Sequence, residues 1–246
     1  MKFKAVFISD THLGTKDSKA SLLLEFIKEI ETKELYLVGD IIDGWSLKRK
    51  WIWLQPHSDV IQKILKAARK GVRVTYILGN HDEFIRPFLP LALGDHIRMV
   101  DEATYKAKNK KRYKIVHGDL YDSITMTKKW LAILGDNGYQ FLLRLNDPIN
   151  TLRQRLGFRR YWSFSQFIKD HVKQAVAYIS DFEKILVAHA REEKFDGIIC
   201  GHIHKAEIRD IEGITYMNCG DWVESCTALV ETLEGEFKII RWLDER

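Results

Sequence analysis

Five short motifs along the chain carry side chains that bind divalent metals. They are residues 10–12 (Asp-Thr-His), 39–43 (Gly-Asp-Ile-Ile-Asp), 79–83 (Gly-Asn-His-Asp-Glu), 117–119 (His-Gly-Asp) and 201–204 (Gly-His-Ile-His). Carboxylate, amide oxygen and imidazole together suit Mn²⁺, Fe or Zn²⁺ better than Ca²⁺. A metal of this kind lowers the pKa of bound water toward neutrality, which makes hydroxide available for hydrolysis. The motifs therefore predict a hydrolytic metal site.

Each motif directly follows a run of residues with the apolar character of a buried strand. The five runs are residues 5–8, 35–38, 72–78, 113–116 and 197–200. Side chains that follow the strands of an α/β sheet converge on one edge, where such folds bind their ligands. We therefore expect the five motifs to meet at one sheet edge.

Apolar residues at helical spacing predict helices over about residues 19–31 and 58–70. Ser18 is expected to cap the first helix, and Gly71 to end the second. Helices that alternate with strands in this way imply parallel strands joined by right-handed crossovers. The first half of the chain is thus predicted to form an α/β layer.

The second half mixes further strands with a different kind of segment. Residues 97–117 favour strands, with a charged turn at residues 108–112 that we interpret as a solvated hairpin tip. A helix is expected over about residues 181–193, and residues 211–214 have the pattern of a hairpin turn. The C-terminal strands are expected to complete a second sheet.

Residues 121–180 interrupt this pattern with helical periodicity, many aromatic residues and a basic charge. They contain nine basic and four acidic residues, an excess equal to the net charge of +5 for the whole chain. The aromatic residues include Trp130, Tyr139, Phe141, Phe158, Tyr161, Trp162, Phe164 and Phe167. We interpret this segment as a helical cap inserted into a domain formed by residues 1–120 and 181–246. The aromatic residues have a second interpretation, as the core of a small helical lid.

Composition places the chain among soluble globular proteins. It has 246 residues, of which 46% are hydrophobic and 30% charged, and no apolar run is long enough to predict a transmembrane helix. The three cysteines, Cys200, Cys219 and Cys226, show neither zinc-binding spacing nor a disulfide framework. A reducing compartment, the cytoplasm, is the expected location.

The five motifs in this order resemble those of the calcineurin-like metallophosphoesterases, and the resemblance extends from Ile8 to His204. It implies an α/β fold, a four-layer α/β/β/α sandwich whose loops carry two divalent metal ions, Mn²⁺ first, with Fe or Zn²⁺ as alternatives. The implied ligands of one ion are Asp10, His12, Asp40 and His204. Those of the other are Asp40, Asn80, His117 and His202.

The same resemblance assigns roles to residues that do not bind metal. His81 would face the scissile phosphate, where it stabilises the transition state or protonates the leaving oxygen. Asp43 and Asp82 would orient the imidazoles, with a loop-capping role as the alternative for both.

Within the superfamily, the chain resembles the UDP-2,3-diacylglucosamine diphosphatases of lipid A biosynthesis. The similarity rests on residues 39–45 (Gly-Asp-Ile-Ile-Asp-Gly-Trp), on residues 117–119 and on the helical insertion. It implies cleavage of the pyrophosphate of a lipid-linked nucleotide, which releases UMP and a lipid sugar phosphate. Basic cap residues would meet the phosphates, apolar ones would receive acyl chains, and the cap would contact the inner membrane surface.

Other functions remain open at this stage. His81 stands where the lipid A enzymes carry arginine, so a general phosphodiesterase or phosphatase acting on a soluble nucleotide or another phosphoester is the alternative. A nuclease is not expected, because the basic residues lie in an aromatic cap and form no extended stripe. A non-catalytic scaffold would lack ligands, whereas every expected ligand is present.

Overall fold

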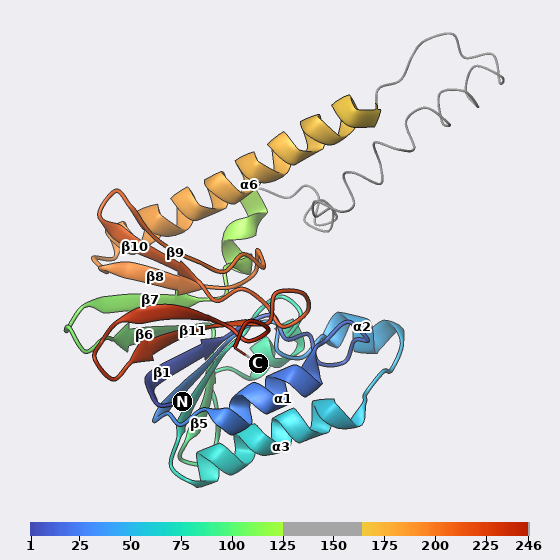
Figure 1. Ribbon diagram of the computed structural model, residues 1–246, viewed down its shortest axis with the longest axis vertical. Helices are drawn as coiled ribbons and strands as arrows, with labels where there is room; N and C mark the ends of the chain where they lie inside the picture. Colours follow the sequence, from blue (N-terminus) through green and yellow to red (C-terminus); the bar gives the residue numbers. More distant parts are fainter. Residues whose placement is uncertain (125–163, 246) are drawn as a thin grey trace, which may run out of the picture. The chain divides into compact units, whose positions relative to one another are not determined.

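The computed structural model describes residues 1–124 and 164–245, with side chains for residues 1–121 and 178–245. The chain divides into two compact units, one formed by Met1–Tyr121 with Lys184–Arg246 and the other by Asp122–Glu183. The cap predicted over residues 121–180 lies largely outside the described residues, so that assignment stays a prediction. The first unit is the α/β sandwich described below (Figure 1).

A seven-stranded sheet forms one half of this unit. Its strands, in spatial order, are β12 (Phe237–Arg241), β11 (Thr227–Thr232), β1 (Phe3–Ile8), β2 (Glu34–Val38), β3 (Arg73–Ile77), β5 (Ile97–Val100) and β4 (Leu91–Leu93). The neighbours β1, β2, β3 and β5 run parallel, as the strand–helix alternation predicts. Alternate residues of β1 enter two cores: Val6 and Ile8 face the helices, and Ala5 and Phe7 face the second sheet. Burial on both faces explains why this strand is apolar throughout.

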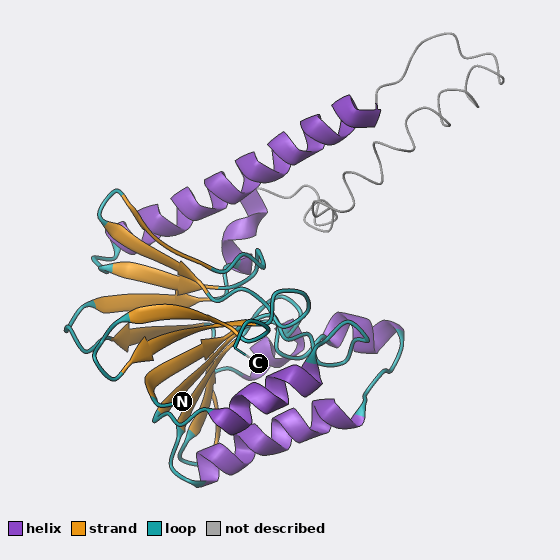
Figure 2. Ribbon diagram, viewed as in Figure 1, coloured by secondary structure: helices purple, strands orange, loops and turns teal. Residues whose placement is uncertain are grey.

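Helices α1 (Ala20–Glu29) and α3 (Gln55–Arg69) cover the outer face of this sheet (Figure 2). The prediction for Gly71 is confirmed, because it follows α3 with a φ of +94°. The prediction for Ser18 is wrong. Its Oγ donates to the carbonyl oxygen of Thr11 at 2.6 Å, and α1 begins without a side-chain cap. Ser18 therefore ties the start of α1 to the first motif.

A five-stranded sheet forms the other half. Its strands, in spatial order, are β6 (Glu102–Lys106), β7 (Arg112–Val116), β8 (Gly197–Cys200), β10 (Ile214–Asn218) and β9 (Glu207–Ile211). The predicted hairpin at residues 211–214 joins β9 to β10. The last two strands do not complete this sheet as expected. Instead, β11 pairs antiparallel with β1, with Val230 opposite Val6. Because β12 pairs with β11, both strands belong to the seven-stranded sheet.

The two sheets pack face to face around an apolar core that includes Phe7, Tyr36, Ile115, Ile199 and Met217. The C-terminal part of α6 (Phe164–Glu192) belongs to the first unit from Lys184 onward and forms the outer layer over β8 and β10. Just beyond α6, Oε2 of Glu193 accepts a bond of 2.6 Å from Lys114 Nζ on β7. The layers are therefore α/β/β/α, as the resemblance implies. None of the described helices is both long and apolar enough to cross a membrane.

Candidate metal centre

The five motifs follow β1, β2 and β3 in one sheet and β7 and β8 in the other. They meet where the carboxyl ends of both sheets come together, and not at the edge of one sheet as expected from the sequence. The backbone is constrained here. Five motif residues have φ between +45° and +69°, a region that costs non-glycine residues free energy and recurs at functional sites: Asp10, His12, Asp40, His202 and His204.

Two glycines allow the motif loops to approach one another. A Cβ atom on Gly79 would lie 2.2 Å from Oδ1 of Asp40, and one on Gly39 would lie 2.2 Å from Nδ1 of His117. Neither distance is sterically possible, so glycine is required at both positions for this geometry.

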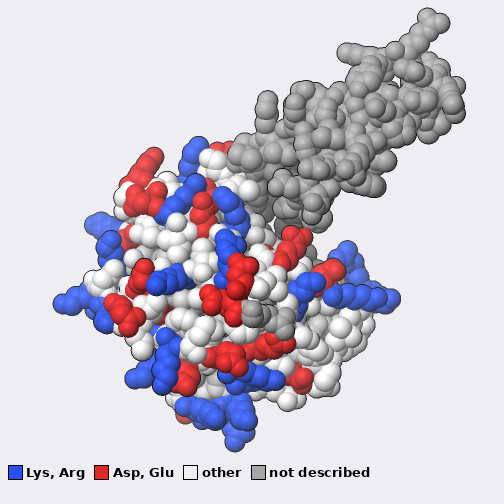
Figure 3. Space-filling model, in the orientation of Figure 1, with Lys and Arg blue, Asp and Glu red and all other residues white. Residues whose placement is uncertain are grey.

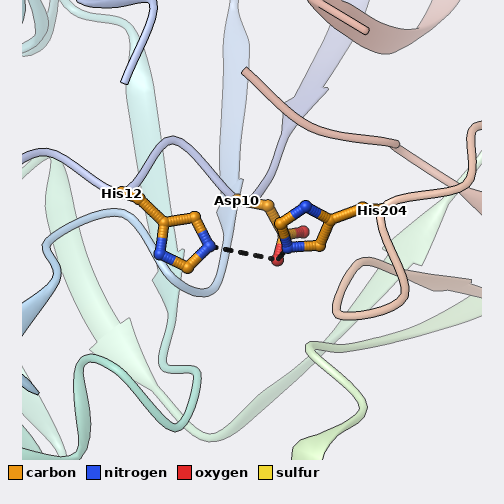
Figure 4. Close-up of side chains that lie close together, drawn as sticks. All are labelled: Asp10, His12 and His204. Atoms are coloured by element: carbon orange, nitrogen blue, oxygen red, sulfur yellow. Dashed lines mark ion pairs between the residues drawn. The ribbon is translucent and has the colours of Figure 1, made fainter. Parts of the chain in front are cut away.

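One group of side chains at the centre consists of Asp10, His12 and His204 (Figure 4). Oδ1 of Asp10 lies 3.2 Å from Nε2 of His204 and 4.0 Å from Nε2 of His12. Oδ2 of Asp10 accepts a hydrogen bond of 3.0 Å from the backbone of His202. Asp10 and His12 are buried, whereas the side chain of His204 is 36% exposed. The group thus lies between the protein interior and solvent.

A second group consists of Asp40, His117 and His202. Nδ1 of His117 donates to the backbone oxygen of Val38 at 2.9 Å, which leaves Nε2 as the acceptor or ligand atom. That Nε2 atom lies 3.3 Å from Oδ2 of Asp40. The rings of His117 and His202 are 5.1 Å apart.

Asp40 lies between the two groups. Its Oδ2 atom, which approaches His117, is also 3.9 Å from Nε2 of His12. Its Oδ1 atom accepts a hydrogen bond of 2.9 Å from the backbone of His81. One carboxylate therefore reaches both groups, which is the position that a shared ligand of two cations would need.

The polar atoms at the centre fit bound cations. Among the described residues, several buried side-chain atoms have no hydrogen-bond partner: Oδ1 of Asp10, Nε2 of His12, Nε2 of His117 and both terminal atoms of Asn80. Buried polar atoms without partners cost free energy and are rare in folded proteins. Oxygen and imidazole nitrogen atoms are the donors that suit divalent transition metals. These side chains therefore suit divalent metal ions.

The charges of these groups depend on one another. Burial alone would raise the pKa of Asp10, but the adjacent His204 lowers it to about 2. Burial alone would lower the pKa of His117, but the carboxylate of Asp40 raises it to about 10. Without cations, protonated imidazoles therefore balance the buried carboxylates. Metal binding requires neutral imidazoles and must release these protons.

Asp43 lies behind the centre and contacts two imidazoles. Its Oδ2 atom is 3.2 Å from Nδ1 of His12, and its Oδ1 atom is 3.0 Å from Nδ1 of His81. Oδ1 also accepts from the backbone N–H of Ser46 at 2.6 Å and thereby caps α2 (Gly44–Arg49). Asp43 is thus placed both to orient imidazoles and to cap a loop, the two roles considered for it.

Asp82 occupies a different environment. Its carboxylate accepts from the backbone N–H groups of Ile41 and Ile42 and from the hydroxyl of Tyr76, at 2.5–3.2 Å. None of these partners is an imidazole, so the structure favours the loop-holding role over the orienting role. Burial and the charge of Asp40 raise the pKa of Asp82 to about 6.

Two features of the site were not assigned a role from the sequence. The ring of Trp45 lies 4.3 Å from that of His81, and its Nε1 donates to Glu83 at 2.7 Å. Arg86 in the short helix η1 (Glu83–Phe88) donates to Asp119 at 2.6 Å and so joins the third motif to the fourth. The sequence offered one indication of the contact between Trp45 and His81: Trp45 lies only two residues after Asp43, in the second motif.

Comparison with known proteins agrees with this geometry. The model of the calcineurin-like phosphoesterase family matches residues 3–206. A protein of Neisseria meningitidis named UDP-2,3-diacylglucosamine hydrolase is 27% identical over 89% of each chain. One of the same name from Haemophilus influenzae is 24% identical over 96% of this chain and 98% of its own. A third, from Porphyromonas gingivalis, is 27% identical, but the chain spans only about half of its length (47%).

Similar solved structures include a hypothetical protein of Pyrococcus horikoshii (12% identity, TM-score 0.48, covering 98% of this chain and 88% of that one). Another is a phosphoesterase of E. coli (13% identity, TM-score 0.44, covering 96% and 98%). The family match extends over most of the chain, from the first strand through all five motifs. The chain therefore belongs to the calcineurin-like phosphoesterase family and is a metal-dependent phosphohydrolase.

Proposed function

We propose that the centre binds two divalent metal ions and hydrolyses the pyrophosphate bond of a lipid-linked nucleotide. The observation that carries the metal assignment is the set of buried, unpartnered ligand atoms on both sides of Asp40. Asp10, His12, Asp40 and His204 would hold one ion. Asp40, Asn80, His117 and His202 would hold the other.

The proposed ion is Mn²⁺, with Fe or Zn²⁺ as alternatives. When bound, two such ions supply Lewis-acid activation of water and neutralise charge on the phosphoryl oxygens. The protein fixes the ligands that hold them. His117 is oriented by its bond to Val38, and Oδ1 of Asp40 is held by the backbone of His81, so that Oδ2 faces the centre.

His81 is the proposed catalytic residue. Its Nδ1 atom lies 3.0 Å from Oδ1 of Asp43, so this carboxylate is placed to orient the ring, and the opposite nitrogen, Nε2, is the one proposed to act on substrate. Nε2 lies 3.8 Å from Oδ2 of Asp40, at the rim of the centre. A proton on Nε2 can pass to the leaving oxygen as the phosphoester bond breaks.

The names of the relatives support the substrate. Several proteins that align with most of the chain are named UDP-2,3-diacylglucosamine hydrolase, so we propose UDP-2,3-diacylglucosamine or a similar lipid-linked nucleotide, cleaved to UMP and a lipid sugar phosphate. Residues 121–180 would form the cap over this substrate and contact the inner membrane surface from the cytoplasm.

A second candidate is a phosphodiesterase or phosphatase that acts on a soluble nucleotide or another phosphoester. His81 favours it, because the lipid A enzymes resembled by this chain carry arginine at that position.

Hydrolysis assays with Mn²⁺ distinguish the two candidates. The lipid-linked substrate UDP-2,3-diacylglucosamine is presented in mixed micelles, and bis(p-nitrophenyl) phosphate is tested in parallel. Release of UMP from the lipid substrate is the expected result. Cleavage of the small diester alone would keep the metal chemistry and reject the lipid substrate.

A further inference from the structure

A basic and aromatic surface lies next to the candidate metal centre, at the end of α2 and in the loop between α2 and α3. We name it the α2 surface and define it by five residues: Lys48, Arg49, Lys50, Trp51 and Leu54. All five are exposed, Trp51 at 73% and Leu54 at 50%. Tryptophan is enriched at membrane–water interfaces, and here it is exposed three residues before an exposed leucine.

The loop that carries Trp51 is anchored from beneath. Trp53 is partly buried against the helical core, and its Nε1 donates to Oγ of Ser58 at 2.9 Å. The ring of Trp53 lies 5.3 Å from His57, a buried residue of α3, and 6.3 Å from Trp51. Trp53 therefore fixes the loop on α3, and Trp51 packs on its solvent side.

The basic residues of the α2 surface are not neutralised locally. In the described part of the chain, Lys48, Arg49 and Lys50 form no ion pair. Some other exposed bases are paired: Arg73, for example, pairs with Glu34. Lys and Arg side chains project at the right-hand edge of Figure 3, where Figure 1 draws α2. The surface thus combines three free positive charges with exposed apolar side chains.

The α2 surface is connected rigidly to the centre. Asp43 caps α2, and the N–H of Gly44 donates to the backbone oxygen of His81 at 3.0 Å. A helix of six residues rises by about 9 Å at 1.5 Å per residue. Whatever binds at the end of α2 is therefore about one short helix away from the residues that border the centre.

We propose that the α2 surface docks the protein on an anionic phospholipid bilayer. Basic residues attract the phosphates of anionic lipids, and tryptophan and leucine enter the boundary between head groups and acyl chains. Docking in this way brings the centre to a phosphoester that lies in the membrane plane. The inference deepens the proposed function by naming a membrane contact outside residues 121–180, and its test needs no catalysis.

The test is sedimentation of the full chain with vesicles at low salt. Vesicles of phosphatidylcholine mixed with phosphatidylglycerol are compared with vesicles of phosphatidylcholine alone. The protein is expected to bind the anionic vesicles, and more weakly as salt is added. Since each base near an anionic surface changes partitioning about fivefold, the loss of three bases in K48A/R49A/K50A should weaken binding by about a hundredfold.

Matched variants distinguish binding through the α2 surface from a general dependence on net charge or on exposed apolar side chains. K66A/R69A/K70A removes the same charge from exposed positions at the other end of α3 and should bind like the wild type. Trp51→Ala should weaken binding about severalfold, whereas Leu233→Ala, at another exposed apolar position, should not. Lipids with brominated acyl chains should quench tryptophan fluorescence less in Trp51→Phe than in the wild type.

Two results would overturn the proposal: a wild-type protein that does not bind anionic vesicles, or two triple variants that bind equally well. Cleavage of bis(p-nitrophenyl) phosphate, measured for each variant, should be unchanged. A protein that binds vesicles through α2 but cleaves neither test substrate would refute the proposed function and leave the docking intact.

Discussion

Two buried polar clusters of this protein differ in whether their atoms have partners. In the first, Glu231 on β11 is wholly buried, and its carboxylate accepts from Lys4 Nζ, from the backbone of Lys108 and from the hydroxyl of Tyr105. In the second, the candidate metal centre, buried atoms of Asp10, His12, Asn80 and His117 lack partners. A satisfied cluster stabilises a fold, whereas an unsatisfied one indicates that a ligand belongs there.

The first cluster also has a clear structural task. Lys4 and Glu231 belong to the seven-stranded sheet and Tyr105 to the five-stranded sheet, so their bonds fasten the two sheets together. The centre forms where the loops of the same two sheets meet. The comparison therefore predicts that mutations in one cluster change stability, and that mutations in the other change metal content and rate.

Asp40→Ala should have the largest effect on activity. Loss of the shared ligand should empty the centre of metal and reduce the rate by at least about 10³-fold, because metal activation is worth several kcal/mol. Metal content per chain and cleavage of bis(p-nitrophenyl) phosphate measure both effects. Asp17→Ala, at an exposed carboxylate, is the control. If the Asp40 variant kept two metals per chain, the shared-ligand assignment would be wrong.

His81→Ala should leave the metals bound and lower the rate by about 10²–10⁴-fold, which is the usual contribution of a general acid. Metal content and turnover must be measured on the same sample, because only their combination separates this role from that of a ligand. An unchanged rate would assign His81 a structural role.

Asp43→Asn tests whether orientation of the imidazoles matters. The variant keeps the shape of the side chain but weakens its contacts with His12 and His81, so we expect a loss of about 10–100-fold in metal affinity or rate. Activity measured as a function of metal concentration separates a loss of metal affinity from a loss of rate at saturating metal. Equal affinity and equal rate would leave Asp43 only its role as the cap of α2.

Glu231→Ala should destabilise the fold without affecting the centre. Removing the carboxylate leaves the hydroxyl of Tyr105 and the backbone N–H of Lys108 without their acceptor, and Lys4 with one partner fewer. We therefore expect the free energy of unfolding to fall by about 1–3 kcal/mol. Urea unfolding measures it. The metal content of the folded protein should equal that of the wild type, and a loss of metal would contradict the distinction between the two clusters.

The sequence predicts the candidate metal centre better than it predicts the Glu231 cluster, for a physical reason. Each motif is local: a buried strand ends, and the polar residues that follow it are adjacent in sequence. The Glu231 cluster depends on the pairing of β11 with β1, whose residues are more than 200 positions apart, and the C-terminal strands were expected in the other sheet. Nothing local to Glu231 indicates that this glutamate is buried.

The same limit applies within the site. The strands that precede the motifs were correctly anticipated, because apolar runs are local signals. Asp82 was expected to orient an imidazole or cap a loop, and only the fold shows it bonded to the backbone of the preceding motif loop. The contact between Trp45 and His81 likewise joins helix α2 to the third motif, two segments that lie apart in the sequence. Residues 125–163 lie outside the described part of the chain, so the cap stays a prediction.

Trp45→Phe should have the smallest effect of these variants. It tests whether a residue outside the metal ligands supports the rate without changing stability or metal content. Phenylalanine keeps an aromatic ring near His81 but loses the bond from Nε1 to Glu83, so the rate should fall by less than about tenfold, because one hydrogen bond contributes about 1 kcal/mol. Metal content should not change. If Trp45 acts by holding His81, the loss should appear in kcat and should largely disappear in the His81→Ala background, since a positioning residue cannot act through a ring that is absent. An equal loss in both backgrounds would mean that Trp45 contacts the substrate directly.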